Sequence, residues 1–138
     1  MSRKNLLLSV LTGALVIGVV LTGGCTPTQI AKDITPQAAF TLIQENQNNP
    51  DFVILDVRTP EEFADGHIEN TINIDFYSDT FQDELDNLDK NKTYLIYCRS
   101  GGRSGKALNI MAELNFKEVY NVSGGVIAWK AEELPTTK

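Results

Sequence analysis

The stretch that decides the fold of this 138-residue chain is YLIYCRSGGRS, residues 94–104. Residues 94–97 are apolar, as in a buried strand, a short loop of small residues follows, and a helical pattern begins at Arg103. This order of strand, tight loop and helix start places Cys98 near backbone N–H groups and the positive end of a helix dipole. Both favour the thiolate, which is the nucleophilic form of cysteine. The sequence therefore predicts a reactive thiol at Cys98.

Strands and helices alternate on both sides of this stretch. This alternation predicts an α/β fold in which a central, mainly parallel sheet carries helices on both faces. Such sheets bind ligands at the carboxyl ends of their strands, where Cys98 lies. The expected strands are 52–55, 72–74, 93–97 and 118–122. The expected helices are 60–65, 79–88, 103–114, 126–133 and one that begins at 36 and ends between 46 and 49.

The chain divides into a signal peptide of residues 1–24, a tether of residues 25–33 and one domain of residues 34–135. The first segment has basic residues at Arg3 and Lys4, then an apolar run and small residues. These three features in this order are typical of a secretory signal. The domain is therefore expected outside the cytoplasmic membrane.

The small residues that end at Cys25 resemble the lipobox of prokaryotic lipoproteins, although Thr22 stands where that pattern prefers leucine. The resemblance implies that Cys25 is diacylated and becomes the N-terminus of a membrane-anchored lipoprotein. An uncleaved anchor is the alternative, because residues 6–24 are 19 uncharged residues, about enough to span a bilayer. A plain secretory signal with an incidental cysteine is the third reading.

The charge of the domain limits its partners. The segment 1–24 holds two of the 12 basic residues and none of the 18 acidic ones, so the rest has a net charge of −8. Such a domain is a poor candidate for nucleic acid or for adhesion to anionic lipid. Its single histidine, His67, offers no histidine-based metal site, and we expect no cofactor. No extended apolar stripe suggests an obligate partner, so we expect a monomer.

The loop after Cys98 has the composition of an anion cradle. Its small residues let the backbone curl and point several N–H groups inward, and two arginines add positive charge. Cysteine-dependent phosphatases have a similar loop, with an arginine six residues after the cysteine. Here Arg103 is the fifth residue after Cys98, and this shorter loop suits sulfur better than a phosphoryl group. The residues expected to bind the substrate are Arg99, Ser100, Gly101, Gly102, Arg103 and Ser104.

Three stretches together resemble the single-domain rhodaneses, a family of sulfurtransferases. The first is DVRTPEEF at 56–63 with GHI at 66–68, and the second is the loop 98–104. The third is GGV at 124–126, followed by Trp129 and by LP at 134–135, with Glu133 where the family usually has glycine. The resemblance implies the rhodanese-like fold.

The resemblance also implies a mechanism. The Cys98 thiolate attacks the outer sulfur of a thiosulfate-like donor, sulfite leaves, and a thiol or cyanide then takes the sulfur from the Cys98 persulfide. The N–H groups of residues 100–103 would hold the persulfide. Arg99, expected to be the more exposed arginine, and Arg103 would steer the donor. A sulfur carrier that serves a partner protein is the alternative, and a short-loop phosphatase or arsenate reductase is a third.

Other conspicuous residues have structural interpretations. Asp56 and Arg58, at the end of a strand, are expected to support the loop as an ion pair. His67 is expected to make a structural hydrogen bond, Glu62 to complete a capping box at a helix start, and Trp129 to lie in the core.

Overall fold

Five strands and five helices alternate along residues 28–138, the part of the chain that this computed structural model describes. The predicted signal residues and Cys25 lie outside the described residues. Within that part, no helix is both long and apolar enough to cross a membrane. The elements are β1 (Ile30–Ile34), α1 (Pro36–Glu45), β2 (Phe52–Asp56), α2 (Pro60–Ala64), β3 (Thr71–Asn73), α3 (Phe81–Asp86), β4 (Thr93–Tyr97), α4 (Gly102–Glu113), β5 (Glu118–Val122) and α5 (Gly125–Ala131).

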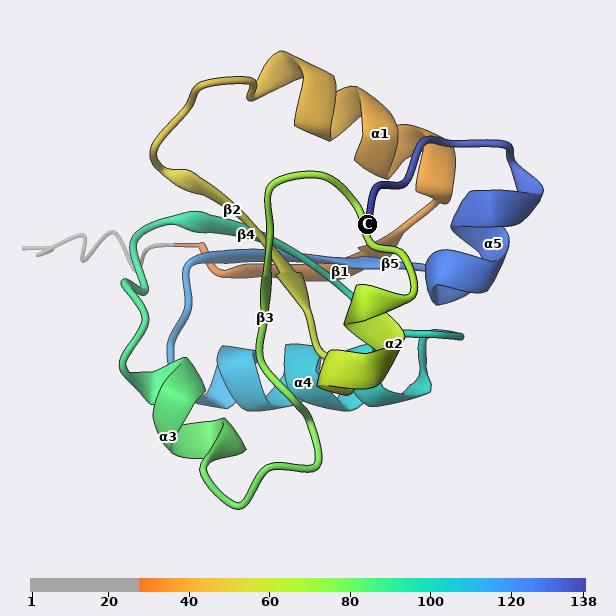
Figure 1. The fold of residues 1–138 in the computed structure, drawn as a ribbon. Coiled ribbons are helices and arrows are strands. Elements are labelled where there is room, and N and C mark those ends of the chain that lie inside the picture. The colour runs from red at the N-terminus through yellow and green to blue at the C-terminus, as the bar shows by residue number, and fades with distance from the viewer. Residues whose placement is uncertain (1–27) are drawn as a thin grey trace, which may run out of the picture.

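The strands form one parallel sheet in the order β1-β5-β4-β2-β3. Helices α1 and α5 lie over one face, and α3 and α4 lie over the other (Figure 1). The predicted α/β architecture is confirmed. Strand β4 lies at the centre of the sheet, so the loop that follows it begins in the middle of the carboxyl edge.

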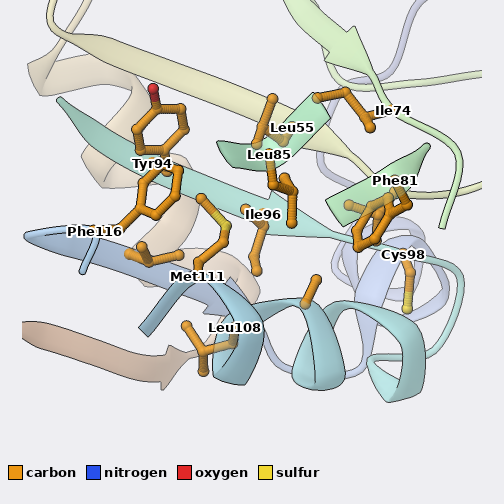
Figure 2. Packing of buried hydrophobic residues seen from close by; sticks show 13 residues of the cluster. Leu55, Ile74, Phe81, Leu85, Tyr94, Ile96, Cys98, Leu108, Met111 and Phe116 are labelled. Atoms are coloured by element: carbon orange, nitrogen blue, oxygen red, sulfur yellow. The ribbon is translucent and has the colours of Figure 1, made fainter. Parts of the chain in front are cut away.

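Alternate residues of β4 face opposite layers, as the two-residue period of a strand requires. Tyr94 and Ile96 pack in the cluster on the α3 and α4 side, whereas Leu95 and Tyr97 pack in the cluster with α1 and α5. Cys98 continues this alternation and belongs to the α4 side (Figure 2). The strand thus aims the thiol at the first turn of α4.

The prediction of a tether over residues 25–33 is wrong for its last four residues. Residues 30–33 belong to β1, which pairs in parallel with β5, and Ile30 N–H donates to Lys117 O at 2.8 Å. β1 lies at the sheet edge, and its three central residues are exposed. An edge strand buries little, so its sequence is polar and resembles a linker. The sheet therefore begins before residue 34.

The other predicted elements are present with shifted ends. Helix α3 is shorter than the predicted 79–88, because Ser78 and Thr80 form a hydrogen-bonded turn before it. Asn115 ends the turn after α4 in the left-handed conformation, with φ of 65°. These differences leave the layers and the site unchanged.

Candidate active site

Cys98 lies directly after β4 with only 1% of its surface exposed. Its Sγ accepts two hydrogen bonds, from the N–H of Gly101 at 3.1 Å and from the hydroxyl of Ser104 at 3.3 Å. Burial alone raises the pKa of the thiol. The hydrogen bonds from Ser104 and from the N–H groups of Gly101 and Ser100 outweigh burial and hold the pKa below its ordinary value. The geometry thus favours the thiolate, as the sequence predicts.

Gly101 makes this cradle possible. Its φ is 99°, a conformation that residues with a side chain rarely adopt. It also lies against Gly124, whose nitrogen would be 3.3 Å from a Cβ at position 101. Gly101 is thus both the turn that points an N–H at the thiol and a close contact with the start of α5.

The start of α5 holds the loop from behind. The N–H of Val126 donates to Cys98 O at 2.9 Å, and the N–H of Ile127 donates to Arg99 O at 3.1 Å. Gly125 has φ of 59°, and a Cβ there would lie 2.6 Å from the carbonyl carbon of Arg99 and closer still to Cys98 O. Gly125 of the third motif therefore lies against the peptide group that joins Cys98 to Arg99. The sequence pattern does not predict this contact. The one feature of the sequence that points to it is the pair of glycines, Gly124 and Gly125, at the start of a helix.

Arg103 is held by Glu62. Its guanidinium donates to both carboxylate oxygens, at 2.7 and 2.8 Å, and lies over the ring of Tyr77. The hydrogen bonds from Arg103 lower the pKa of Glu62 to about 2. Glu62 also accepts from the N–H of Thr59 and so completes the predicted capping box of α2. The carboxylate thus has a second contact, with the loop, that the sequence analysis missed.

The remaining cation of the loop, Arg99, is exposed, as are Ser100 and Gly102. Arg103 is only half-buried, with 16% of its side chain exposed, so the prediction that Arg99 is the more accessible arginine is confirmed. Arg99 lines a cavity of about 190 Å³ between α2 and α5. The other lining residues are Arg58, Glu62, Asp65, Gly66, Val126, Ile127 and Lys130.

Asp56 and Arg58 form a buried ion pair at the end of β2, with an N–O distance of 2.6 Å. Arg58 also donates to Gly66 O at 2.8 Å, and Asp56 stands opposite Tyr97 in the sheet. Tyr97 immediately precedes Cys98, so the pair braces the strand end next to the nucleophile.

His67 and Trp129 lie outside the loop. Nδ1 of His67 is 3.0 Å from Phe63 O, and its ring stacks on the Phe63 ring. The indole of Trp129 is 1% exposed and donates to Pro135 O at 2.9 Å. Both side chains are thus structural, although Trp129 also lines a separate cavity of about 480 Å³. In residues 28–138, no group of three or more His, Cys, Asp and Glu side chains could hold a metal ion.

The chain is similar in sequence to known proteins. The chain is 32% identical over 95 residues to a protein of Allochromatium vinosum named sulfurtransferase, a match that covers 69% of this chain and 87% of that protein. It is 41% identical over 102 residues to the tRNA uridine(34) hydroxylase of Photorhabdus laumondii, which covers 65% of this chain. The chain spans only 28% of the length of that hydroxylase.

Solved structures give the same fold. A rhodanese-related protein of Thermoplasma volcanium superposes with a TM-score of 0.64 at 28% identity, covering 77% of this chain and 97% of that one. A rhodanese-like domain protein of Staphylococcus aureus gives a TM-score of 0.61 at 36% identity, covering 71% of this chain and 90% of that one. Residues 40–132 match the family model of the rhodanese-like domain. The chain therefore belongs to the rhodanese-like domain family, which has sulfurtransferases among its members.

Proposed function

We propose that this protein is a thiosulfate-type sulfurtransferase with Cys98 as its nucleophile. The observation that carries the proposal is the buried Cys98 sulfur, which accepts hydrogen bonds from Gly101 and Ser104 and has a lowered pKa. The match to the Allochromatium vinosum sulfurtransferase covers most of that protein and supports this reaction. The match to the hydroxylase covers a much smaller part of its length.

In the first half-reaction, the Cys98 thiolate attacks the outer sulfur of thiosulfate. The bond between the two thiosulfate sulfurs breaks, sulfite leaves with both electrons of that bond, and a Cys98 persulfide anion remains. The N–H of Gly101 and the hydroxyl of Ser104 already donate to Cys98 Sγ, and donors placed there would also stabilise the negative charge of the sulfur bonded to it. Arg99, exposed beside the thiol, would attract the dianionic donor. The expected contact of Arg103 with the donor stays a prediction, because Glu62 holds its guanidinium.

In the second half-reaction, cyanide or a thiolate attacks the terminal sulfur of the persulfide. With cyanide, the sulfur–sulfur bond breaks, thiocyanate leaves, and the Cys98 thiolate is regenerated. Charge balances in both halves without a cofactor or an outside oxidant. A short loop braced by α5 and by the Asp56–Arg58 pair would hold the reacting sulfur in place throughout.

The test is the intact mass of the protein after thiosulfate treatment, followed by thiocyanate release on addition of cyanide. Cys98→Ser is the control. One added sulfur atom that cyanide removes with turnover supports the proposal. An adduct without turnover indicates the carrier alternative, and no adduct with any sulfane donor overturns the proposal and favours phosphate or arsenate chemistry.

We further propose that the protein is held outside the cytoplasmic membrane through lipid on Cys25. The sequence of residues 1–25 supports this placement. Growth with an alkyne-tagged fatty acid should label the wild type and leave Cys25→Ala unlabelled and released. Unlabelled protein that stays in the membrane would indicate an uncleaved anchor, and unlabelled protein that is released would indicate a plain secretory signal.

We propose small anionic donors and thiol or cyanide acceptors as the partners, with no nucleic acid. The net charge of −8 after residue 24, from 10 basic and 18 acidic residues, supports this choice. We also propose a monomer. Light scattering at micromolar concentration should give the mass of one chain, and a stable dimer would contradict this.

A further inference from the structure

The chain joins the domain at the pole opposite Cys98. The side-chain amide of Gln29 donates to the carbonyls of Ala112 and Phe116, both at 2.8 Å. Ala112 lies at the end of α4, whereas Cys98 lies at the start of the same helix. Figure 1 shows β1 starting on the left, where α4 ends, and α2 and α5 on the right, where α4 begins. Gln29 thus fixes the incoming chain to one end of the molecule.

The distance between Gln29 and Cys98 along the domain can be worked out from the rise per residue of a strand and of a helix. Ile30 is level with Glu118 and Thr93 in the sheet. Cys98 lies five residues beyond Thr93, about 16 Å along a strand. The ten residue steps from Gly102 to Ala112 give about 15 Å along the helix. Both place the thiol on the far side of the domain from Gln29.

The covalent link before Gln29 is short. Cys25 precedes Gln29 by four residues, which can span at most about 14 Å when fully extended. To lay the Cys98 loop on a bilayer, this link would have to bridge the whole height of the domain, about 16 Å or more. The link is therefore too short to let the Cys98 loop face the bilayer. The two hydrogen bonds of the Gln29 side chain, which we call the Gln29 clamp, also prevent β1 from detaching and adding its residues to the link.

We propose that the domain is anchored with the end of α4 toward the membrane and Cys98 toward the aqueous phase. The inference rests on the proposed anchoring through Cys25. It implies that sulfur donor and acceptor are water-borne molecules and that a thiol embedded in the same bilayer cannot reach the persulfide. The short covalent link produces this orientation.

The test uses the full chain, purified from membranes in detergent and reconstituted into phosphatidylethanolamine–phosphatidylglycerol vesicles. The persulfide is formed with thiosulfate, and two acceptors are compared: a soluble thiol and a phospholipid with a thiol headgroup. We expect the soluble thiol to take the sulfur equally well in vesicles and in detergent. The thiol lipid should take it in mixed micelles and lose this ability when it shares the vesicle with the protein. Transfer to the thiol lipid in vesicles at the micellar rate would overturn the inference.

Orientation is also measured directly in the Cys98→Ser background. A dye on Lys117→Cys, near the Gln29 clamp, should transfer energy to an acceptor on the lipid headgroups more efficiently than a dye on Ile127→Cys. Gln29→Ala should reduce the difference in energy-transfer efficiency between the two dyes. Gln37→Ala is the control: it changes an exposed glutamine of α1 and should leave that difference unchanged. Equal transfer from the two dyes in the Cys98→Ser background with Gln29 intact would overturn the inference.

The failure of anchoring is distinguishable from the failure of orientation. Flotation of the vesicles on a density gradient shows first whether the chain is bound. A chain that forms the persulfide in detergent but does not float keeps the proposed reaction and overturns both the anchoring and this inference. A chain that floats but forms no persulfide contradicts the proposed reaction, and the two dyes still decide the orientation.

Discussion

Replacing Gly125 by alanine tests whether α5 positions the nucleophile. The new Cβ would lie 2.6 Å from the carbonyl carbon and oxygen of Arg99, whereas ordinary contact begins at 3.4 Å. The backbone of Cys98 and Arg99 would therefore have to retreat by about 0.8 Å or more, because the atoms that the new Cβ meets, including the still closer Cys98 O, are backbone and not a flexible side chain. That retreat moves Cys98 Sγ relative to the N–H of Gly101 and the hydroxyl of Ser104.

The expected loss is large. Displacing a reacting group by about 1 Å can cost on the order of 100-fold in rate, and we expect kcat/KM for thiosulfate to fall by about that factor. The strain of φ of 59° at position 125 should add about 1–2 kcal/mol of destabilisation. Thiocyanate formation gives the rate, and thermal unfolding shows whether the variant is folded at the assay temperature.

Gly105→Ala is the matched control. Gly105 lies within α4, and a Cβ there meets nothing within 4 Å. This variant should keep full activity and gain about 0.5–1 kcal/mol of stability from a better helix former. If folded Gly125→Ala turned over thiosulfate as fast as Gly105→Ala, the idea that α5 positions Cys98 would be wrong.

Three further predictions concern single side chains. The lowered pKa of Glu62, about 2 in the fold against 4.5 ordinarily, stabilises the protein above pH 4.5, and this contribution should disappear as the pH falls toward 2. Glu62→Gln should therefore lower the free energy of unfolding at pH 7 by about 1.5–3 kcal/mol, measured by denaturant titration. At pH 2 the two proteins should differ little. The rate of Cys98 alkylation, plotted against pH, should have its midpoint below 9.0, the ordinary pKa of a cysteine thiol. Ser104→Ala should raise this midpoint. An unchanged midpoint would show that Ser104 does not stabilise the thiolate. Glu133→Gly should raise the melting temperature without changing turnover, because Glu133 has φ of 57° and a left-handed residue costs about 1–2 kcal/mol.

The parts of the fold that sequence reasoning predicted are those with a local signature. β4 and its loop are such a case, because an apolar run ends at Cys98 and small residues follow. The capping box at Thr59 is another, since its two partners are three residues apart. β1 was missed because an edge strand exposes its polar residues and resembles a linker.

The missed parts of the candidate site depend on tertiary contacts. Glu62 and Arg103 are 41 residues apart, and the capping box already explains a glutamate at position 62. The hydrogen bonds from Val126 and Ile127 to the loop need the packing of α5 against the end of β4. Periodicity and spacing report on neighbours along one element, so they cannot show which distant elements meet.

The pairing of β1 with β5 has a consequence for the order in which the molecule assembles. Asp33 and Asn121, joined by a hydrogen bond between these two strands, are 88 residues apart. Contacts between such distant segments form slowly because a long loop must close first. The ribosome must release nearly the whole chain before this edge of the sheet can close. Until then, the β5 edge of the sheet stays open, whereas the strand and the helices around Cys98 do not depend on β1.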